Sequence, residues 1–146
     1  MKITFGIPGK IKNKEIKNLI EYYIQLCGKF ASVELVALEK KNEAQINVWL
    51  KNSGPRIFLT VLDETGEVFD SKQCAKKCAK ILNGSHTRWI VLCGGENGYS
   101  KIFKDQAHWI WSLSPLTFPH EIAALIAAEQ IYRSFAILNN HPYHNA

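Results

Sequence analysis

The sequence contains no long hydrophobic run, which argues against a membrane-spanning protein. No stretch approaches the roughly 18 consecutive apolar residues that a membrane span needs. The N-terminal segment Met1–Gly6 also offers no apolar stretch of the length found in secretory signal peptides. We therefore expect a cytoplasmic protein with no membrane partner.

Cysteines are also scarce, and in a cytoplasmic protein we expect all four to be reduced. Cys74 and Cys78 lie four residues apart on a predicted helix, but no second Cys/His pair follows at zinc-finger spacing. We predict no metal site and interpret the thiols as small apolar core residues, with metal or redox chemistry as the alternative. The glycine-rich segment Gly94–Gly98 lacks both the GxGxxG fingerprint and a P-loop lysine, so it does not imply a nucleotide phosphate.

Positive charge exceeds negative charge in this chain of 146 residues, with a formal net charge of +5 and a pI of about 9.0. One group of basic residues, Lys72, Lys76, Lys77 and Lys80, lies on a single predicted helix. An excess of this size is compatible with a polyanionic partner but does not identify one. The hydrophobic content of 47% and the length predict one globular domain, residues 1–146.

Strand-like and helix-like patterns alternate along the chain. We predict strands at Lys2–Pro8, Ala31–Leu38, Arg56–Leu62, Trp89–Cys93 and Trp109–Leu113. We predict helices at Lys14–Cys27, Ser71–Leu82 (capped by Ser71), Lys101–Gln106 and Pro119–Leu138, a weak helical pattern in Glu39–Asn52 and a turn at Asp63–Gly66. This alternation predicts an α/β fold with a mainly parallel sheet flanked by helices.

The last third of the sequence has the most distinctive features. Leu113–Pro119 mixes apolar side chains with two prolines, which stiffen the backbone. A stiff loop that leads into a helix is a good place to hold a ligand with backbone groups. After the long helix comes a polar tail, Asn139–His144, with two histidines and a tyrosine. Chain ends usually fray, so an ordered tail of this composition would indicate function.

Three blocks of the sequence resemble the ribosomal RNA large-subunit methyltransferase H family. They are WSLSPLTFPHE with AEQIYRSF and NHPYH in the last third, LCGGENGYS at Leu92–Ser100, and TVLD at Thr60–Asp63. The family consists of small bacterial SPOUT-class enzymes that methylate a pseudouridine of 23S rRNA. The resemblance implies a SPOUT-type fold with a C-terminal trefoil knot, a homodimer, S-adenosylmethionine as cofactor, and 23S rRNA in the ribosome, rather than DNA, as partner.

The resemblance also places the cofactor on three loops that follow strands. The positions that match are Leu62, Gly94, Gly95, Leu113, Ser114, Pro115, Leu116, Thr117 and Phe118. Backbone groups and apolar side chains of this kind can read an adenine edge and sandwich its ring. The alternative for the apolar members of this set is plain core packing, and for the glycines a tight turn.

Methyl transfer to the imino N3 of a pseudouridine requires alignment of the two reactants and an acceptor for the N3 proton. Our candidates are His141, Tyr143 and His144 in the tail, with Glu96 as a further acceptor. The resemblance carries the active-site role to Tyr143 and His144. It makes Arg133, in the long helix, a candidate for contact with RNA or with a second subunit.

The sequence departs from the family pattern at its end, where Asn145 and Ala146 follow His144 in place of the basic residue that many members carry. The segment Glu39–Asn52 is also shorter and less basic than its counterparts. Both differences are expected to affect how the protein binds RNA, and not the chemistry of methyl transfer. The competing functional hypotheses are another SPOUT-class RNA methyltransferase acting on tRNA, a non-catalytic RNA- or ribosome-binding module, and a small-molecule-binding α/β protein.

Overall fold

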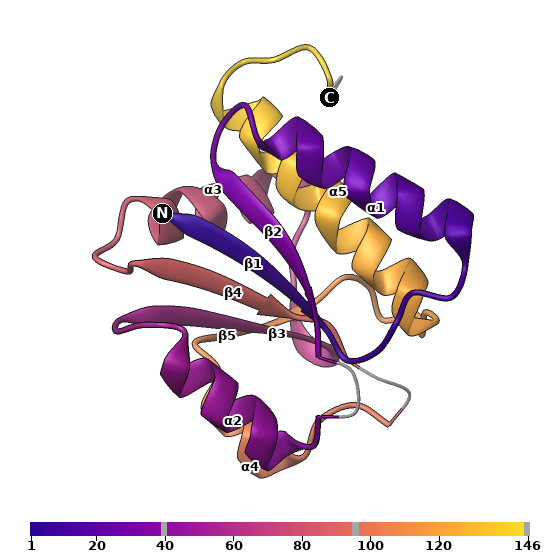
Figure 1. The fold of residues 1–146 in the computed structure, drawn as a ribbon. Helices are drawn as coiled ribbons and strands as arrows, with labels where there is room; N and C mark the ends of the chain where they lie inside the picture. The colour runs from indigo at the N-terminus through magenta and orange to yellow at the C-terminus, as the bar shows by residue number, and fades with distance from the viewer. Residues whose placement is uncertain (39–40, 95–96, 145–146) are drawn as a thin grey trace.

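A five-stranded β-sheet forms the centre of the computed structural model, which describes residues 1–38, 41–94 and 97–144 (Figure 1). All neighbouring strands are parallel, in the order β2-β1-β4-β3-β5. The strands are β1 (Lys2–Ile7), β2 (Ser32–Ala37), β3 (Ile57–Val68), β4 (Arg88–Leu92) and β5 (Trp109–Ser112). The helices are α1 (Lys14–Cys27), α2 (Glu43–Asn52), α3 (Ser71–Leu82), α4 (Lys101–Asp105) and α5 (His120–Leu138). The α/β architecture predicted from the sequence is confirmed.

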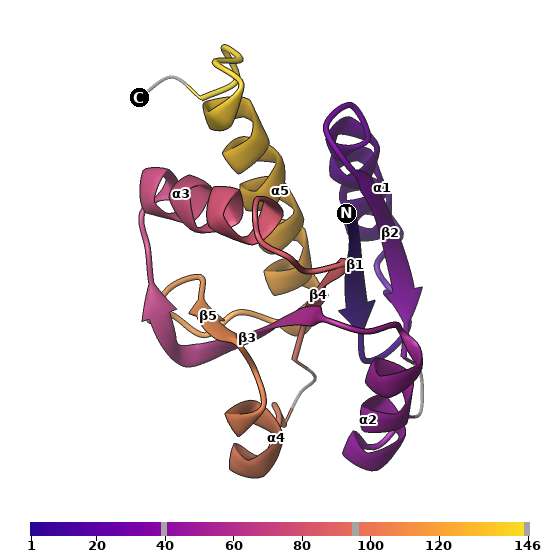
Figure 2. The same cartoon turned by 90° about the vertical axis from the view of Figure 1, so that its left-hand side faces the viewer.

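Helices cover both faces of the sheet. Figures 1 and 2 show α1, α3 and α5 on one face and the shorter α2 and α4 on the other. Each face has its own cluster of buried apolar side chains, the larger one beneath α1, α3 and α5. The central strand β4 is buried from Trp89 to Leu92, as its continuous apolar sequence predicted. The one polar side-chain group of this buried stretch, the Trp89 indole N–H, donates a 2.8 Å hydrogen bond to the Thr60 hydroxyl on β3.

Strand β3 runs farther than the sequence predicted. The expected turn Asp63–Gly66 is wrong, because the chain bulges there and then resumes its pairing with β5. Leu62 and Glu67 are both in register with Trp111, so the four residues between them are extra on the β3 side. A bulge re-aims side chains that would otherwise alternate across the sheet, and bulges are common beside functional sites. This one lies where β3 reaches the carboxyl edge of the sheet.

The start of α3 also differs from the prediction. Asp70, not Ser71, is the N-cap: its carboxylate accepts the Gln73 backbone N–H at 2.8 Å, and the Gln73 side chain accepts the Asp70 N–H at 2.8 Å. Ser71 is the first helical residue, and its hydroxyl donates to Gln130 on α5 at 2.9 Å. An aspartate and a serine side by side are both good caps, so sequence alone did not separate them. The predicted bounds of α1, Lys14–Cys27, are confirmed.

Helix α5 is apolar around most of its circumference because α1 and α3 pack on two of its sides. It ends in a Schellman motif with Asn140 in the left-handed region at φ 55°. The His141 N–H donates to the Ala136 carbonyl at 2.8 Å, and the Asn140 N–H donates to that of Ile137 at 3.3 Å. These bonds turn the tail back toward the helix that it leaves.

No helix of the described residues is long and apolar enough to cross a membrane. The trefoil knot implied by the resemblance stays a prediction, since the order of strands in the sheet does not report how the chain is threaded.

Candidate active site

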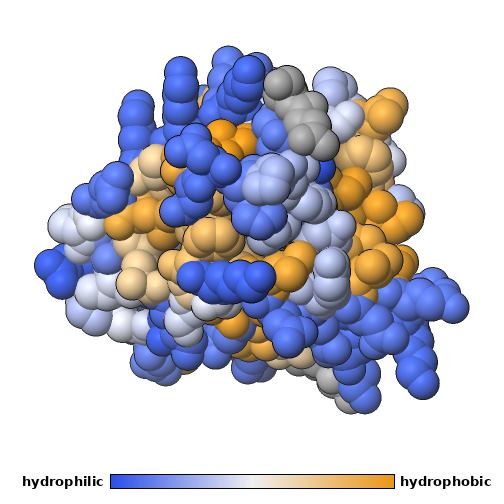
Figure 3. Space-filling view, turned by 90° about the horizontal axis from the view of Figure 1, so that it is seen from above, coloured by the Kyte–Doolittle hydropathy of each residue, from blue (hydrophilic) through white to orange (hydrophobic). Residues whose placement is uncertain are grey.

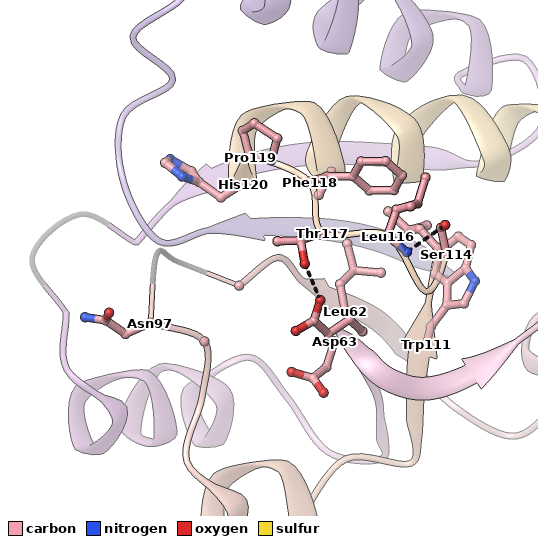
Figure 4. A pocket seen from close by; sticks show the side chains of 15 residues that line it. Leu62, Asp63, Asn97, Trp111, Ser114, Leu116, Thr117, Phe118, Pro119 and His120 are labelled. Carbon is pink, nitrogen blue, oxygen red and sulfur yellow. Dashed lines mark hydrogen bonds between the residues drawn. The ribbon is translucent and has the colours of Figure 1, made fainter.

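A pocket of about 770 Å³ opens at the carboxyl edge of the sheet, beside the bulge of β3 and the ends of β4 and β5 (Figure 4). Parallel α/β sheets characteristically bind ligands at this edge. Seven of the nine predicted cofactor residues line the pocket: Leu62, Gly94, Leu113, Ser114, Leu116, Thr117 and Phe118. Pro115 is described but is not among the lining residues, and Gly95 lies outside the described residues. A strand bulge and two loops, far apart in the sequence, thus meet at one cavity.

The proline-containing loop is held in shape by short-range hydrogen bonds. The Ser112 hydroxyl donates to the Ser114 carbonyl at 3.0 Å, and the Leu116 N–H donates to the Ser114 hydroxyl at 3.0 Å. Core packing explains Leu62, which is only 7% exposed, but not Leu116, which is 68% exposed at the pocket. An exposed leucine on an ordered loop beside a cavity suits contact with a ligand better than contact with the core.

The bulge of β3 brings two carboxylates to the pocket, Asp63 and Glu64. Asp63 pairs with Lys104 at 3.4 Å and also accepts from Thr65. Burial raises the pKa of Asp63, but the bonds from Thr65 and the nearby Lys104 ammonium outweigh this and leave the pKa below its usual value. Asp63 is therefore ionised at neutral pH.

Glu64 accepts a 2.9 Å hydrogen bond from the Thr117 hydroxyl, which ties the bulge to the proline-containing loop (Figure 4). It has no lysine or arginine partner among the described residues, and no lysine or arginine lines the described part of the pocket. A chain with net charge +5 thus places at this cavity one carboxylate, Glu64, without a cationic partner among the described residues, beside the Asp63–Lys104 ion pair. Sequence reasoning missed these two acids because it interpreted Asp63–Gly66 as a turn. The signal available was their position directly after a buried strand.

His120 also lines the pocket, together with Asn97 from the glycine-rich segment. The position of His120 at the start of the last helix predicts local capping or packing. The N-cap is instead Pro119, which has no side chain capable of a capping hydrogen bond, and His120 is the first helical residue. The candidate acceptor Glu96 lies outside the described residues.

The tail forms a second cluster on the last turns of α5. The Tyr143 hydroxyl donates to Glu129 at 2.9 Å and lies 3.3 Å from the Tyr23 hydroxyl on α1. Its ring packs edge-on against Tyr132, with centroids 4.7 Å apart, and lies under the Arg133 guanidinium at 4.8 Å. Burial, followed by the bonds to Tyr23 and Glu129, raises the pKa of Tyr143, so the phenol stays protonated at neutral pH.

Arg133 is engaged on two sides. Its Nε and Nη2 donate to Glu129 Oε1 at 3.0 and 2.6 Å, and its Nη1 lies 3.0 Å from His144 Nδ1. The hydrogen bond to Glu129 raises the pKa of Arg133 further. Because an arginine only donates, His144 Nδ1 accepts, and a neutral ring then carries its proton on Nε2. That Nε2 is buried and has no hydrogen-bond partner within the described residues.

His141 stands apart from this cluster. It is exposed, and its Nδ1 accepts the Tyr143 backbone N–H at 3.2 Å, which shapes the turn of the tail. Of the three predicted catalytic residues, the structure therefore joins Tyr143 and His144 through Arg133 and leaves His141 outside the cluster.

The pocket and the tail cluster lie at opposite ends of α5. Pro119 and His120 at the pocket begin the helix, and the tail follows its last residue, Leu138. Nineteen helical residues span about 28 Å, so the chain does not bring its own tail to its own pocket. Figure 2 shows the tail at the far end of α5 from the sheet edge where the pocket opens.

The four cysteines are free and buried. Within residues 1–38, 41–94 and 97–144 no group of three or more His, Cys, Asp or Glu side chains is arranged to hold a metal ion.

A parallel sheet with a ligand-sized pocket at its carboxyl edge, beside a stiff loop and a long terminal helix, defines an α/β protein that binds a small molecule. Comparison with known proteins gives the family. A family model described as "Predicted SPOUT methyltransferase" matches residues 1–144. A "Ribosomal RNA large subunit methyltransferase H" of Prochlorococcus marinus is 38% identical over 93% of this chain and 90% of its own length. One from Acetivibrio thermocellus is 34% identical over 99% of both chains.

The fold also resembles a solved structure, that of a probable methylase family protein from Haemophilus influenzae. The two share 12% sequence identity with a TM-score of 0.54, over 97% of this chain and 67% of the other. The chain belongs to the SPOUT methyltransferase family, together with the relatives just named. It is accordingly an S-adenosylmethionine-dependent methyltransferase.

Proposed function

We propose that this chain transfers a methyl group to N3 of a pseudouridine in 23S rRNA, acting in the cytoplasm on assembled ribosomes. The names of the relatives, which match over nearly the whole chain, support ribosomal RNA of the large subunit as the substrate. The single observation that carries the catalytic part is the pocket. It gathers seven residues predicted to contact the cofactor together with two carboxylates that the prediction missed.

The pocket suits S-adenosylmethionine in size, shape and charge. About 770 Å³ lies within the usual range for sites of small molecules. Leu62, Leu113 and Phe118 provide apolar walls for an adenine ring, and Gly94 leaves backbone groups accessible. The cofactor carries a sulfonium and an ammonium group, and Glu64 offers a carboxylate of opposite charge, while Asp63, ionised and paired with Lys104, offers further acceptor oxygens. We assign these residues, with Ser114, Pro115, Leu116 and Thr117 of the loop, to cofactor binding.

When bound, S-adenosylmethionine supplies a methyl group already activated by its sulfonium. The chain must align the acceptor and help to remove the N3 proton. Tyr143 and His144 are the residues that we assign to the acceptor. The His144 Nε2–H is a hydrogen-bond donor that can orient a carbonyl group flanking N3, and the Tyr143 phenol oxygen, whose one O–H is donated to Glu129, can accept the N3–H. Glu129, which already accepts from Tyr143 and Arg133, is the nearest carboxylate to them and could take up a proton through the phenol.

A homodimer joins the two halves of the site. The tail lies about a helix length from the pocket of its own chain, so the tail that completes a pocket must come from a second copy. The surface between the two also suits such pairing. Ile122 and Leu116 are exposed and Leu125 is half-buried, next to the start of α5. Figure 3 shows apolar side chains gathered on the side of the molecule where α5 begins.

Arg133 was predicted to contact RNA. Its contacts with Glu129, Tyr143 and His144 support a role in ordering the tail. Direct contact with an RNA phosphate stays a prediction. His141, exposed at the turn of the tail, is proposed to meet the RNA rather than the reacting atoms.

Calorimetric titration with S-adenosylmethionine tests the cofactor site directly. Micromolar binding is expected, and no binding would leave only a module that keeps the fold without catalysis. Tritiated methyl transfer then separates the substrates. Label on 70S ribosomes from a strain that lacks the modification is expected, whereas label on free tRNA alone would assign the chain to another SPOUT activity.

A further inference from the structure

Three lysines form a straight row on the outer side of α3. Lys72, Lys76 and Lys80 are spaced four residues apart, and all three are exposed. Residues at this spacing lie above one another on a helix, about 6 Å apart along its axis. The opposite side of α3 faces the core through Cys74, Cys78 and other buried residues. We call the row of Lys72, Lys76 and Lys80 the lysine face.

The lysine face is electrostatically unfavourable in the isolated chain. None of its three ammonium groups forms an ion pair among the described residues, and α3 contains no acidic residue. The preceding carboxylate, Asp70, is occupied as the N-cap. Like charges at i,i+4 cost about 0.2–0.5 kcal/mol per pair. The helix dipole disfavours Lys72 in the first turn and favours Lys80 in the last, so the repulsion within the row is the net unfavourable effect. A surface that repels itself in this way is suited to an anionic partner.

The position of the lysine face indicates which part of the molecule that partner approaches. α3 packs against the second half of α5, through the Ser71–Gln130 bond and the buried contact of Cys74 with Ser134. Figure 2 shows α3 beneath the end of α5 that carries the tail. A polyanion lying along α3 is therefore brought beside Tyr143 and His144.

We propose that the lysine face is a docking surface for the sugar-phosphate backbone of the substrate RNA, one that holds the strand while its target base reaches the tail. This inference rests on the proposed function, because it takes RNA as the substrate. A row of point charges about 6 Å apart along one line suits successive phosphates of one strand, which are separated by a similar distance.

An anionic membrane surface fits the lysine face less well. Helices that lie on membranes place apolar side chains on the contacting side. The apolar residues of α3 are turned into the core, and none of its described residues is an exposed large hydrophobic residue. The aliphatic stem of the neighbouring Lys77 is also turned inward, with its ammonium 5.5 Å from the centre of the Trp109 ring, so it does not belong to the face.

The test compares two triple variants with the same loss of charge. One is Lys72→Gln/Lys76→Gln/Lys80→Gln. The control is Lys12→Gln/Lys14→Gln/Lys17→Gln, three exposed lysines in and just before the first turn of α1. Binding of the full chain to large ribosomal subunits is measured over a series of salt concentrations. Each phosphate contact contributes about 0.7–0.9 to the slope of log K against log salt, so loss of the lysine face should reduce the slope by about 2. At low salt we expect at least a tenfold loss of affinity.

Equal slopes for the two variants, or a slope equal to that of the unmodified chain, would overturn the proposal. Calorimetry on the same variants should give unchanged binding of S-adenosylmethionine, and thermal unfolding should give an equal or higher Tm because repulsion is relieved. A chain that binds no S-adenosylmethionine would contradict the proposed function alone, since the salt slope reports the lysine face separately. The lysine-face variant is also tested on phosphatidylserine vesicles. If it loses binding to the vesicles while its salt slope on ribosomal subunits is unchanged, the lysine face binds membranes and its assignment to RNA is overturned.

Discussion

The Tyr143 hydroxyl donates a 2.9 Å hydrogen bond to Glu129 Oε1, a residue fourteen positions earlier in the chain. The same oxygen accepts two N–H groups of Arg133, at 3.0 and 2.6 Å. One carboxylate oxygen therefore fixes both the tail and the arginine that touches His144. These contacts and the Schellman motif hold the tail in place as far as His144.

Replacing Tyr143 by Phe should separate the role of its hydroxyl from that of its ring. The variant keeps the packing on Tyr132 but loses the bonds to Glu129 and Tyr23, which should cost about 1 kcal/mol of stability. We expect methyl transfer to fall at least tenfold with an unchanged Kd for S-adenosylmethionine. His144→Ala should do the same. Normal turnover in both variants would remove the tail from the active site.

Replacing Glu64 by Gln should weaken cofactor binding selectively. The carboxylate carries a charge that complements the sulfonium, whereas the product S-adenosylhomocysteine has lost that charge. Because Glu64 is exposed, the effect should be modest, about 2- to 5-fold on the Kd of S-adenosylmethionine and less on that of the product.

Thr117→Ser serves as the control for this change, since it keeps the hydroxyl that bonds to Glu64. Calorimetry with both ligands makes the comparison. If Glu64→Gln weakens the binding of both ligands equally, Glu64 acts by holding the loop in place and not by attracting the sulfonium charge.

The dimer can be tested at the start of α5. Ile122 is 38% exposed beside the pocket, and Ile122→Asp should shift the chain toward monomer by placing a charge in an apolar contact. Ile102→Asp on α4 is the matched control, because Ile102 is 87% exposed on the other face of the sheet. Light scattering at working concentrations gives the mass of each. If the unmodified chain is a monomer, it contradicts the composite site, in which the tail of one chain completes the pocket of another.

The buried thiols predict a loss of stability in alkali. Burial raises the pKa of both Cys27 and Cys93 to about 12, from the usual value of 9.0. A group with a raised native pKa contributes stability that is complete below its unfolded pKa, so this stability should fall as pH rises from about 9 toward 12. Urea unfolding at a series of pH values measures it, and Cys27→Ala should flatten the slope. Rapid reaction of the native chain with Ellman's reagent would contradict burial.

The sequence predicted the α/β class because each buried strand and amphipathic helix has its own periodicity, as in Lys14–Cys27. It failed at Asp63–Gly66, where turn-like residues sit inside a strand. Gly66 shows why, because a Cβ there would lie 2.4 Å from the Ile110 carbonyl oxygen. Glycine is needed at this position because β3 passes close to β5, not because the chain reverses direction. Local composition cannot report contact with a strand more than forty residues away.

The candidate site was predictable only in part. The loop Leu113–Phe118 could be identified because prolines and apolar residues are unusual in a connector. The distance of the tail from the pocket could not, because it depends on how the ends of α5 lie relative to the sheet. The role of Arg133 could not be predicted either. The i,i+4 spacing allows an ion pair with Glu129, but the sequence does not distinguish such a paired arginine from one that is free to bind RNA.

The most direct test of the account is a mixing experiment with two inactive variants. Glu64→Arg should block cofactor binding, because it places a long cationic side chain at the pocket of a cationic ligand, whereas Glu64→Gln only removes a charge. His144→Ala should abolish the contribution of the tail. If a pocket of one chain works with the tail of another, mixed dimers contain one intact composite site and should regain tritiated methyl transfer to unmodified 70S ribosomes, to about a quarter of the normal rate. Ribosomes that stay unlabelled after the two variants have exchanged chains, with both parents inactive, would contradict the composite site.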